Sequence, residues 1–273
     1  ILPDTFRLEK GSIDSLSVSY GEAGRPYVLD GTRVESAYDA GSSQYRFEMQ
    51  GGRLCLPFKG CPEFSLMSGT AQFNHASRRV NVPSCRLTTA AGGYLDIKGD
   101  WDGSSSSWTA NMVVNGVPAS SVLEGHWKKH VQGSVSGGID LRGGRDGVTH
   151  VAGLARLQGG MLTGLPVLDR LALFCGSSRF RNLPLHEASA QFSYQESAWH
   201  ISNILVESEN LVRVEGWLEI WKGGALTGRL QVGRRADGLW KALPGFSDVF
   251  SVSRQGAGGN LAWANVNIGG TLD

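Results

Sequence analysis

Apolar and polar residues alternate in short segments along the chain, beginning at residues 15–20 and again at residues 44–49. This period of two is typical of β-strands with one buried face, because successive side chains of a strand point to opposite sides. Glycine-containing pairs that suit tight hairpin turns punctuate these segments. They include Asp30-Gly31, Gly51-Gly52, Asp102-Gly103 and Asn115-Gly116. The pattern predicts a mainly β fold: a curved, open antiparallel sheet shaped like a groove, with a few short α-helices.

One succession of strands occurs twice. Ala71-Gln72-Phe73 matches Ala190-Gln191-Phe192 at an offset of 119 positions. The same offset carries Val80, Val82, Cys85 and Leu87 onto Trp199, Ile201, Ile204 and Val206. After a two-residue deletion, Leu95, Ile97 and Gly99 fall onto Val212, Val214 and Gly216. The apolar positions keep their parity within each strand, as a sheet with one buried face requires.

Both copies continue through a fourth strand into a short helix, predicted at residues 118–131 in the first copy and 237–243 in the second. A further helix precedes the second copy, because apolar residues recur at spacings of three and four through residues 165–175. We interpret this helix as closing one end of the β core. The chain is thus divided into N-terminal strands (residues 1–68), a first repeat (69–150) and a second repeat (151–273).

Charge and cysteine content narrow the classes of function. The 26 Lys and Arg residues balance 25 Asp and Glu residues, so no electrostatic field favours nucleic acid as a partner. No apolar run reaches the length of about 20 residues that a membrane-spanning helix needs. Residues 6–8 open without a helix or leader and residues 268–273 stop in strand-like sequence, which predicts that the chain is part of a longer protein. Cys55 and Cys61 are spaced to close a small disulfide loop or to serve as buried thiols, and the sequence leaves both open.

The glycine-rich segment at residues 157–171, which ends in Gly164-Leu165-Pro166 and an apolar stretch, resembles the C-terminal region of AsmA-like proteins, where such a strand leads into a helix. The resemblance continues through residues 180–220, with Val212-Arg213-Val214-Glu215-Gly216 as a characteristic strand end, and through residues 243–250 and 266–273. It covers residues 150–273 well and residues 65–145 more loosely, through the repeat. These positions determine a fold and include no catalytic group.

The resemblance implies a role in handling lipid, because AsmA-like proteins form long β grooves in the Gram-negative envelope and are anchored by an N-terminal membrane helix. The chain is then expected to be a non-enzymatic periplasmic module for lipid transport or outer-membrane maintenance, attached to the inner membrane through a segment outside this sequence. Its expected partners are phospholipid or another envelope lipid and the remainder of its own chain. Alternation would place these side chains along the groove: Phe73, Leu87, Leu95, Ile97, Phe192, Ile204, Val206, Val212 and Val214.

Motifs for other chemistry are weak. His126 and His130 are four residues apart with two lysines between them, and no third ligand lies nearby in sequence. The sequence contains neither a nucleophile elbow nor a phosphate loop, so no cofactor or catalytic residue is predicted. Trp217 and Trp221 share one strand face, and paired aromatic rings of this kind can stack on sugars. A carbohydrate- or protein-binding β module of the envelope is therefore the alternative function.

Overall fold

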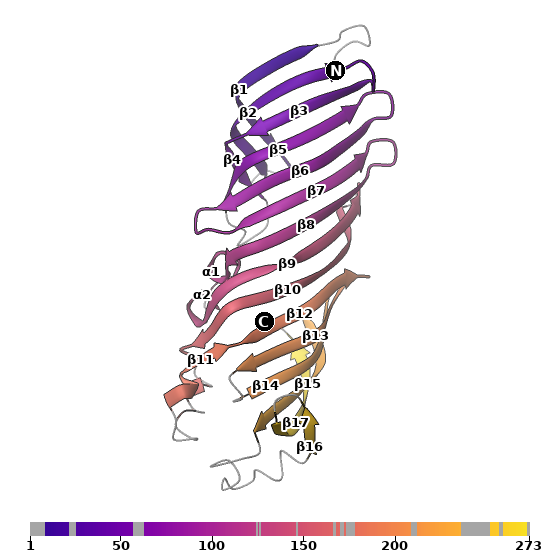
Figure 1. Ribbon diagram of the computed structural model, residues 1–273. Coiled ribbons are helices and arrows are strands. Elements are labelled where there is room, and N and C mark those ends of the chain that lie inside the picture. The colour runs from indigo at the N-terminus through magenta and orange to yellow at the C-terminus, as the bar shows by residue number, and fades with distance from the viewer. Residues whose placement is uncertain are drawn as a thin grey trace. The chain divides into compact units, whose positions relative to one another are not determined.

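The structure is a computed structural model (Figure 1) that describes residues 9–21, 26–56, 63–123, 125, 127–145, 147–165, 168–169, 172, 178–208, 212–235, 252–256 and 259–271. The chain divides into two compact units. Unit 1 comprises residues 1–122 and 138–151, and unit 2 comprises residues 123–137 and 152–273. Most of the described residues lie in antiparallel strands, which confirms the predicted mainly β fold with an open antiparallel sheet and a few short helices.

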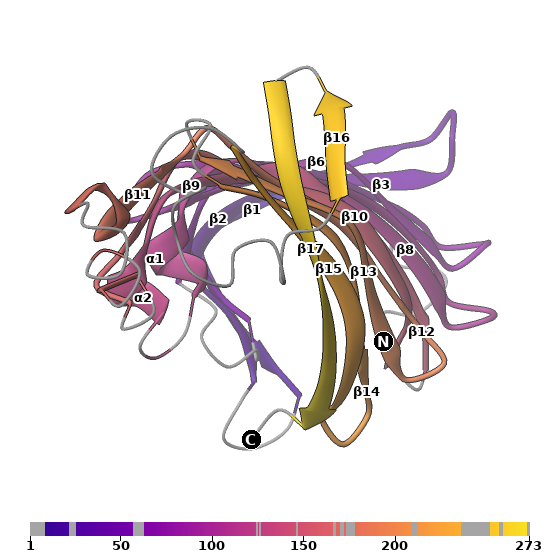
Figure 2. The same ribbon diagram turned by 90° about the horizontal axis from the view of Figure 1, so that it is seen from below.

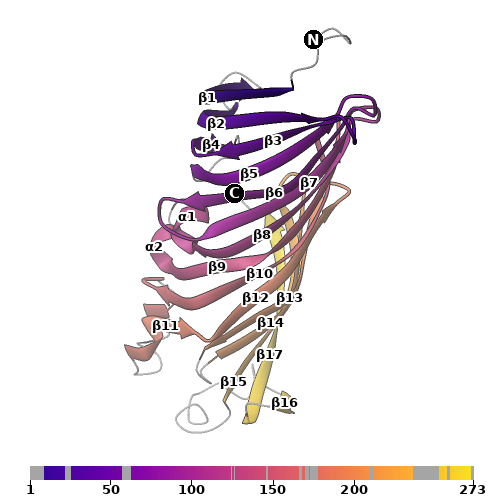
Figure 3. The ribbon, with the colours of Figure 1, turned by 45° about the horizontal axis from the view of Figure 1, so that its top comes forward.

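Unit 1 is a sheet whose strands lie in chain order (Figure 3), except that the third and fourth share one place between the second and the fifth. The strands are β1 (Lys10–Tyr20), β2 (Tyr27–Asp39), β3 (Gln44–Gln50), β4 (Arg53–Cys55), β5 (Phe64–Asn74), β6 (Arg79–Thr89), β7 (Tyr94–Asp102) and β8 (Ser107–Pro118). The short helix α1 (Ala119–Val122) follows β8. β9 (Val131–Gly144) and β10 (Gly147–Thr163) pair with each other, and each contributes residues to both units.

Unit 2 continues with α2 (Trp127–His130), the 3₁₀ turn η1 (Ser178–Phe180), β11 (Asn182–Leu185), β12 (Glu187–Gln195), β13 (Ala198–Ser208), β14 (Val212–Trp221), β15 (Ala225–Arg235), β16 (Val252–Gly256) and β17 (Gly259–Thr271). β12 to β15 form a meander, after which β17 pairs with β15 and with β16. β15 and β17 curve along their length (Figure 2).

The two four-strand meanders, β5–β8 and β12–β15, have matching registers. Phe73 lies opposite Val80 in β6, and Phe192 lies opposite Ile201 in β13. The residue equivalent to Val80 is therefore Ile201, two positions beyond the Trp199 that the sequence alignment assigned. The β12–β13 hairpin has two more residue pairs than the β5–β6 hairpin. It ends in a turn with positive φ at Glu196 and Ser197. A shift of two keeps every side chain on its face, so apolar parity alone does not detect it.

Each meander has a glycine in its third strand where the neighbouring backbone comes close. Gly99 lies opposite Val82, and Gly216 lies opposite Ile204. In both copies the ladder is irregular beside that pair, at Val82/Cys85 and at Ile201/Ile204. A Cβ added at Gly99 would lie 2.9 Å from the carbonyl oxygen of Thr109, and one at Gly216 would overlap that of Arg229. Both copies therefore combine a glycine with a neighbouring β-bulge, which lies opposite Lys98 before the glycine in unit 1 and opposite Trp217 after it in unit 2.

The helices differ from the prediction in part. The single helix expected over residues 118–131 is two four-residue helices, α1 and α2, and Gly125 between them has φ +57°. That backbone conformation cannot continue a right-handed helix. At the helix predicted over residues 165–175, the amides of Leu168 and Asp169 donate to the carbonyl of Leu165. The remainder of this helix and the one predicted over 237–243 lie largely or wholly outside the described residues.

Each unit has its own small core. In unit 1 the buried cluster contains Phe64, Leu66, Leu87, Leu95 and Val117, with Leu54 and Leu56 packed against it. In unit 2 it contains Leu168, Ala172, Leu183 and Leu185, with Val206 and Val212 at its margin. No described helix is both long and apolar enough to cross a membrane.

Candidate functional site

One face of the sheet in unit 2 is apolar, and we call it the apolar face. Its side chains lie in rows of directly opposed residues that cross β12, β13, β14, β15 and β17. One row is Ala188, Val206, Val214, Val232 and Ala264, and another is Phe192, Ile201, Leu218, Gly228 and Ile268. A third row contains Ile204, Gly216, Leu230 and Val266. The register therefore joins apolar residues from five strands into one surface.

The apolar face is only half covered. β14 is paired with a strand on each side, yet none of its ten residues is buried. Val212, Val214, Leu218 and Ile220 on this strand all retain partial exposure. Val266 in β17 is 42% exposed, and Trp199 in β13 is 39% exposed. In an ordinary two-layer domain, the inward side chains of a central strand are covered by a second layer.

Aromatic rings border this face at the β12–β13 hairpin. The ring of Trp199 lies 5.1 Å from that of Tyr194 and 6.3 Å from that of Phe192, centroid to centroid. The three rings pack side by side at distances typical of aromatic pairs. They give the face an aromatic edge.

In unit 1 part of the corresponding face is buried in the hydrophobic core. Leu87 and Leu95 are 0% and 7% exposed, because Phe64, Leu66 and Val117 pack around them. Phe73 and Ile97 are half-buried. Along β8, exposed residues alternate with half-buried residues up to Gly116. The partly exposed part of this face therefore lies away from the Leu87–Leu95 cluster.

The nine residues predicted to contact lipid all occupy the apolar side of their strands, according to the registers. Four are in unit 1, where Leu87 and Leu95 have become core. The other five are in unit 2, where all are half-buried: Phe192, Ile204, Val206, Val212 and Val214. Lipid contact by these residues remains a prediction, and unit 2 offers the larger accessible set.

The opposite face of unit 2 is polar. Arg213 donates to Glu207 over 3.0 Å and to Glu215 over 2.6 Å, and the bond to Glu215 is the main reason that the pKa of this guanidinium is raised. His200 lies 3.2 Å from Glu219 on the neighbouring strand. Trp217 and Trp221 also lie on this face and are 41% and 47% exposed. The sheet thus separates apolar from polar side chains.

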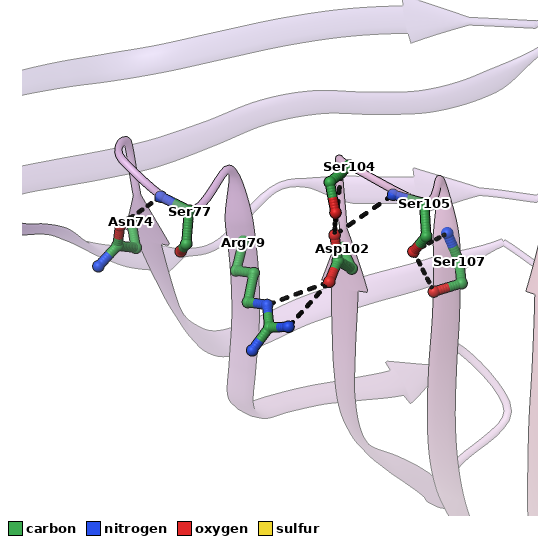
Figure 4. Close-up of polar contacts among 7 residues, drawn as sticks. All are labelled: Asn74, Ser77, Arg79, Asp102, Ser104, Ser105 and Ser107. Carbon is green, nitrogen blue, oxygen red and sulfur yellow. Dashed lines mark hydrogen bonds and ion pairs between the residues drawn. The ribbon is translucent and has the colours of Figure 1, made fainter.

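A hydrogen-bonded cluster holds the turns at one end of unit 1 (Figure 4). Asp102 accepts hydrogen bonds from the backbone amides of Ser104 and Ser105 and from the guanidinium of Arg79, with which it forms an ion pair. Asn74 accepts from the amide of Ser77 in the preceding turn. The hydrogen bonds from Ser104 are the largest cause that lowers the pKa of Asp102 to about 2. These contacts fix turn geometry, which is a structural role.

We predict that Asp102→Asn makes the protein less stable at pH 7 than the parent, and that this difference fades in acid. The pKa of Asp102 is about 2 when folded and about 3.9 in an unfolded chain. Its contribution is therefore complete above about pH 5 and disappears as the pH falls through about 2. Thermal unfolding at pH 7, 4 and 2 measures this. Asp14→Asn is the control, because Asp14 is exposed on β1. An equal loss at every pH would contradict the assignment.

The other candidate groups are engaged elsewhere or lie outside the described residues. His130 Nδ1 lies 2.8 Å from the carbonyl oxygen of Thr163, and His126 lies outside the described residues. Among the residues that the structure describes, no three His, Cys, Asp or Glu side chains are grouped to hold a metal ion. Cys55 is a free thiol, and Cys61 lies outside the described residues. Burial raises the pKa of the Cys85 thiol, which makes it less reactive.

A scan against protein-family models finds no match, and searches of curated proteins and of solved structures also find none.

Proposed function

We propose that this protein is a non-enzymatic, lipid-binding β module of the bacterial periplasm, and that acyl chains lie along the apolar face of unit 2. The proposal combines the AsmA-like sequence pattern with the two-faced sheet. Inner-membrane attachment through another part of a longer chain, and a role in lipid transport or outer-membrane maintenance, follow from the resemblance. The ligand would be phospholipid or another envelope lipid.

This proposal rests on the partial exposure of the apolar side chains of β14. A strand that is paired on both sides and apolar on one face is normally buried on that face, but β14 has no buried residue. Contiguous exposed apolar surface in a folded protein marks a place where something binds. Here partly exposed residues continue across five strands through the rows defined above, in which Gly228 and Ala264 are buried.

The chemistry of the face favours an acyl chain. Its rows contain valine, isoleucine, leucine, alanine and phenylalanine, with no charged side chain among the opposed residues of the three rows. Each methylene group removed from water contributes about 0.8 kcal/mol. Ten methylenes against the face would therefore contribute about 8 kcal/mol before the costs of ordering the chain. A surface without directional polar groups holds chains of different length and saturation.

The test compares two charges added to neighbouring positions on opposite faces of β17. Val266→Asp places a carboxylate on the apolar face, whereas Asn267→Asp places one on the polar face. Both side chains are exposed, so neither change should prevent folding. We expect phospholipid to co-purify with the parent protein and with Asn267→Asp after expression in a bacterial periplasm, and to fall at least five-fold with Val266→Asp. Native mass spectrometry with lipid extraction measures this.

Two results would count against lipid binding. Folded parent protein free of lipid, and unable to take up phospholipid from vesicles, would leave the apolar face as a surface for a protein partner. Equal lipid in the Val266→Asp and Asn267→Asp proteins would place the lipid elsewhere. Circular dichroism and thermal unfolding confirm that each variant is folded before the comparison.

A further inference from the structure

A hollow on the polar face of unit 2 combines an exposed aromatic ring with a cation. Trp217 and Arg229 are directly opposed across β14 and β15. Directly opposed side chains have Cβ atoms about 5 Å apart. Trp217 is 41% exposed, so much of its ring is open to solvent. The hollow around them has a volume of about 840 Å³.

The bulge in β13 supplies one wall of the hollow. The ladder is irregular between Ile201 and Ile204, and Asn203 within it has φ +49°. The side-chain amide of Asn203 donates to Gln191 Oε1 over 2.8 Å, which fixes its orientation. On the other side, Gln231 lines the hollow and donates to Asn265 over 3.1 Å. Polar groups held in place therefore surround the Trp217 ring.

Two arginines, Arg213 and Arg229, line the hollow, and they differ in whether a carboxylate neutralises them. Arg213 is neutralised by Glu207 and Glu215, at 3.0 and 2.6 Å. Arg229 forms no ion pair with any residue in the part of the chain that the structure describes. A guanidinium presents several N–H donors in a plane that suits carboxylate or phosphate oxygens. Its position beside an exposed ring is suited to a ligand that is both cyclic and anionic.

The first repeat has different residues at the positions of Trp217 and Arg229. In unit 1 the residue after the bulge glycine is Asp100, which lies opposite Thr109 in the register that pairs Trp217 with Arg229. Asp100 accepts a hydrogen bond from Asn81 over 2.7 Å, a local contact within the sheet. The third and fourth strands therefore pair in the same way with a carboxylate and a hydroxyl at these positions, although the bulge of β6 lies on the other side of the glycine, opposite Lys98. Pairing of the third and fourth strands therefore does not depend on an aromatic residue and a cation at this position.

From this geometry we infer that the hollow is a binding site for a sugar ring that carries an anionic group. The ring stacks on the indole of Trp217, and the phosphate or carboxylate pairs with Arg229. Asn203 and Gln231 are placed to hydrogen-bond the hydroxyl groups. The site lies on the face opposite the proposed lipid surface and does not depend on that function. Two sources present this chemistry: the phosphorylated sugar of a glycolipid headgroup and the acidic sugars of a polysaccharide.

Binding of defined sugars to the whole chain tests the inference. Glucosamine 1-phosphate represents the first source, a galacturonic acid trisaccharide represents the second, and glucosamine and a neutral trisaccharide are the uncharged comparisons. Isothermal titration calorimetry and tryptophan fluorescence report binding. We expect at least one anionic sugar to bind, at least ten-fold more tightly than its neutral counterpart. Tighter binding of the phosphate or of the uronic acid identifies the source, and either result supports the site.

Variants locate the site. Trp217→Ala and Arg229→Gln should each weaken binding at least ten-fold, and Arg229→Gln should remove the preference for the anionic sugar. Trp221→Ala is the matched control, because Trp221 lies on the same strand and face, is 47% exposed, and is not among the residues lining the hollow. The inference is overturned if folded protein binds neither anionic sugar at 10 mM, or if Trp221→Ala weakens binding as much as Trp217→Ala.

Discussion

Gly216→Ala is expected to lower the free energy of unfolding by about 3 kcal/mol or more. Gly216 has φ +155°, a conformation that residues with a Cβ rarely adopt. An added Cβ would overlap the carbonyl oxygen of Arg229 and lie 2.9 Å from the Cα of Leu230. Both obstacles are backbone atoms of β15, so relief requires β14 and β15 to separate. Urea unfolding followed by tryptophan fluorescence measures the loss.

Two other glycines make the measurement specific. Gly269 in β17 has no atom within 4 Å of an added Cβ and no positive φ, so Gly269→Ala should change stability by less than about 0.5 kcal/mol. Gly99, the equivalent of Gly216 in unit 1, has a close contact with Thr109 without a positive φ, so its replacement should have an intermediate effect. A Gly216→Ala protein as stable as Gly269→Ala would show that β15 can move away without cost.

The alternation of apolar and polar residues predicted the strands of the repeat and which residues of each strand share a side. Val206 and Val214 are opposed in the sheet, as are Leu87 and Leu95. The period of two is local, and it depends only on how side chains leave an extended backbone. It does not depend on which strands become neighbours. The order of the strands in the repeat was therefore recognised from the sequence. The alignment of β13 with β6, however, was displaced by two residues.

The sequence pattern did not predict how much of each apolar side chain is exposed. Leu87 and Val206 look alike in their strands, yet Leu87 is fully buried and Val206 is half-buried. The difference arises from distant segments, because Leu54, Leu56 and Val117 close over the cluster in unit 1. In the same way, Trp217 was singled out from the sequence but Arg229 was not. Only the β14–β15 register brings the two together.

The difference between core and apolar face leads to the second prediction. Leu87→Ala is expected to lower the free energy of unfolding by about 3 kcal/mol, because Leu87 is 0% exposed and its loss leaves a cavity among Phe64, Leu66 and Val117. Met67→Ala on the adjacent strand β5 is the control, since Met67 is 53% exposed and its truncation should cost less than about 0.5 kcal/mol. Urea unfolding of the two variants beside the parent measures both values.

The Leu87→Ala protein also separates stability from ligand binding. Because the substituted residue lies in the core of unit 1, folded Leu87→Ala protein at low temperature should retain the phospholipid of the parent. Val266→Asp should show the reverse, with stability close to that of the parent and at least a five-fold loss of lipid. If Leu87→Ala removed lipid from folded protein while Val266→Asp did not, the binding surface would lie in unit 1 and the exposure of β14 would need another explanation.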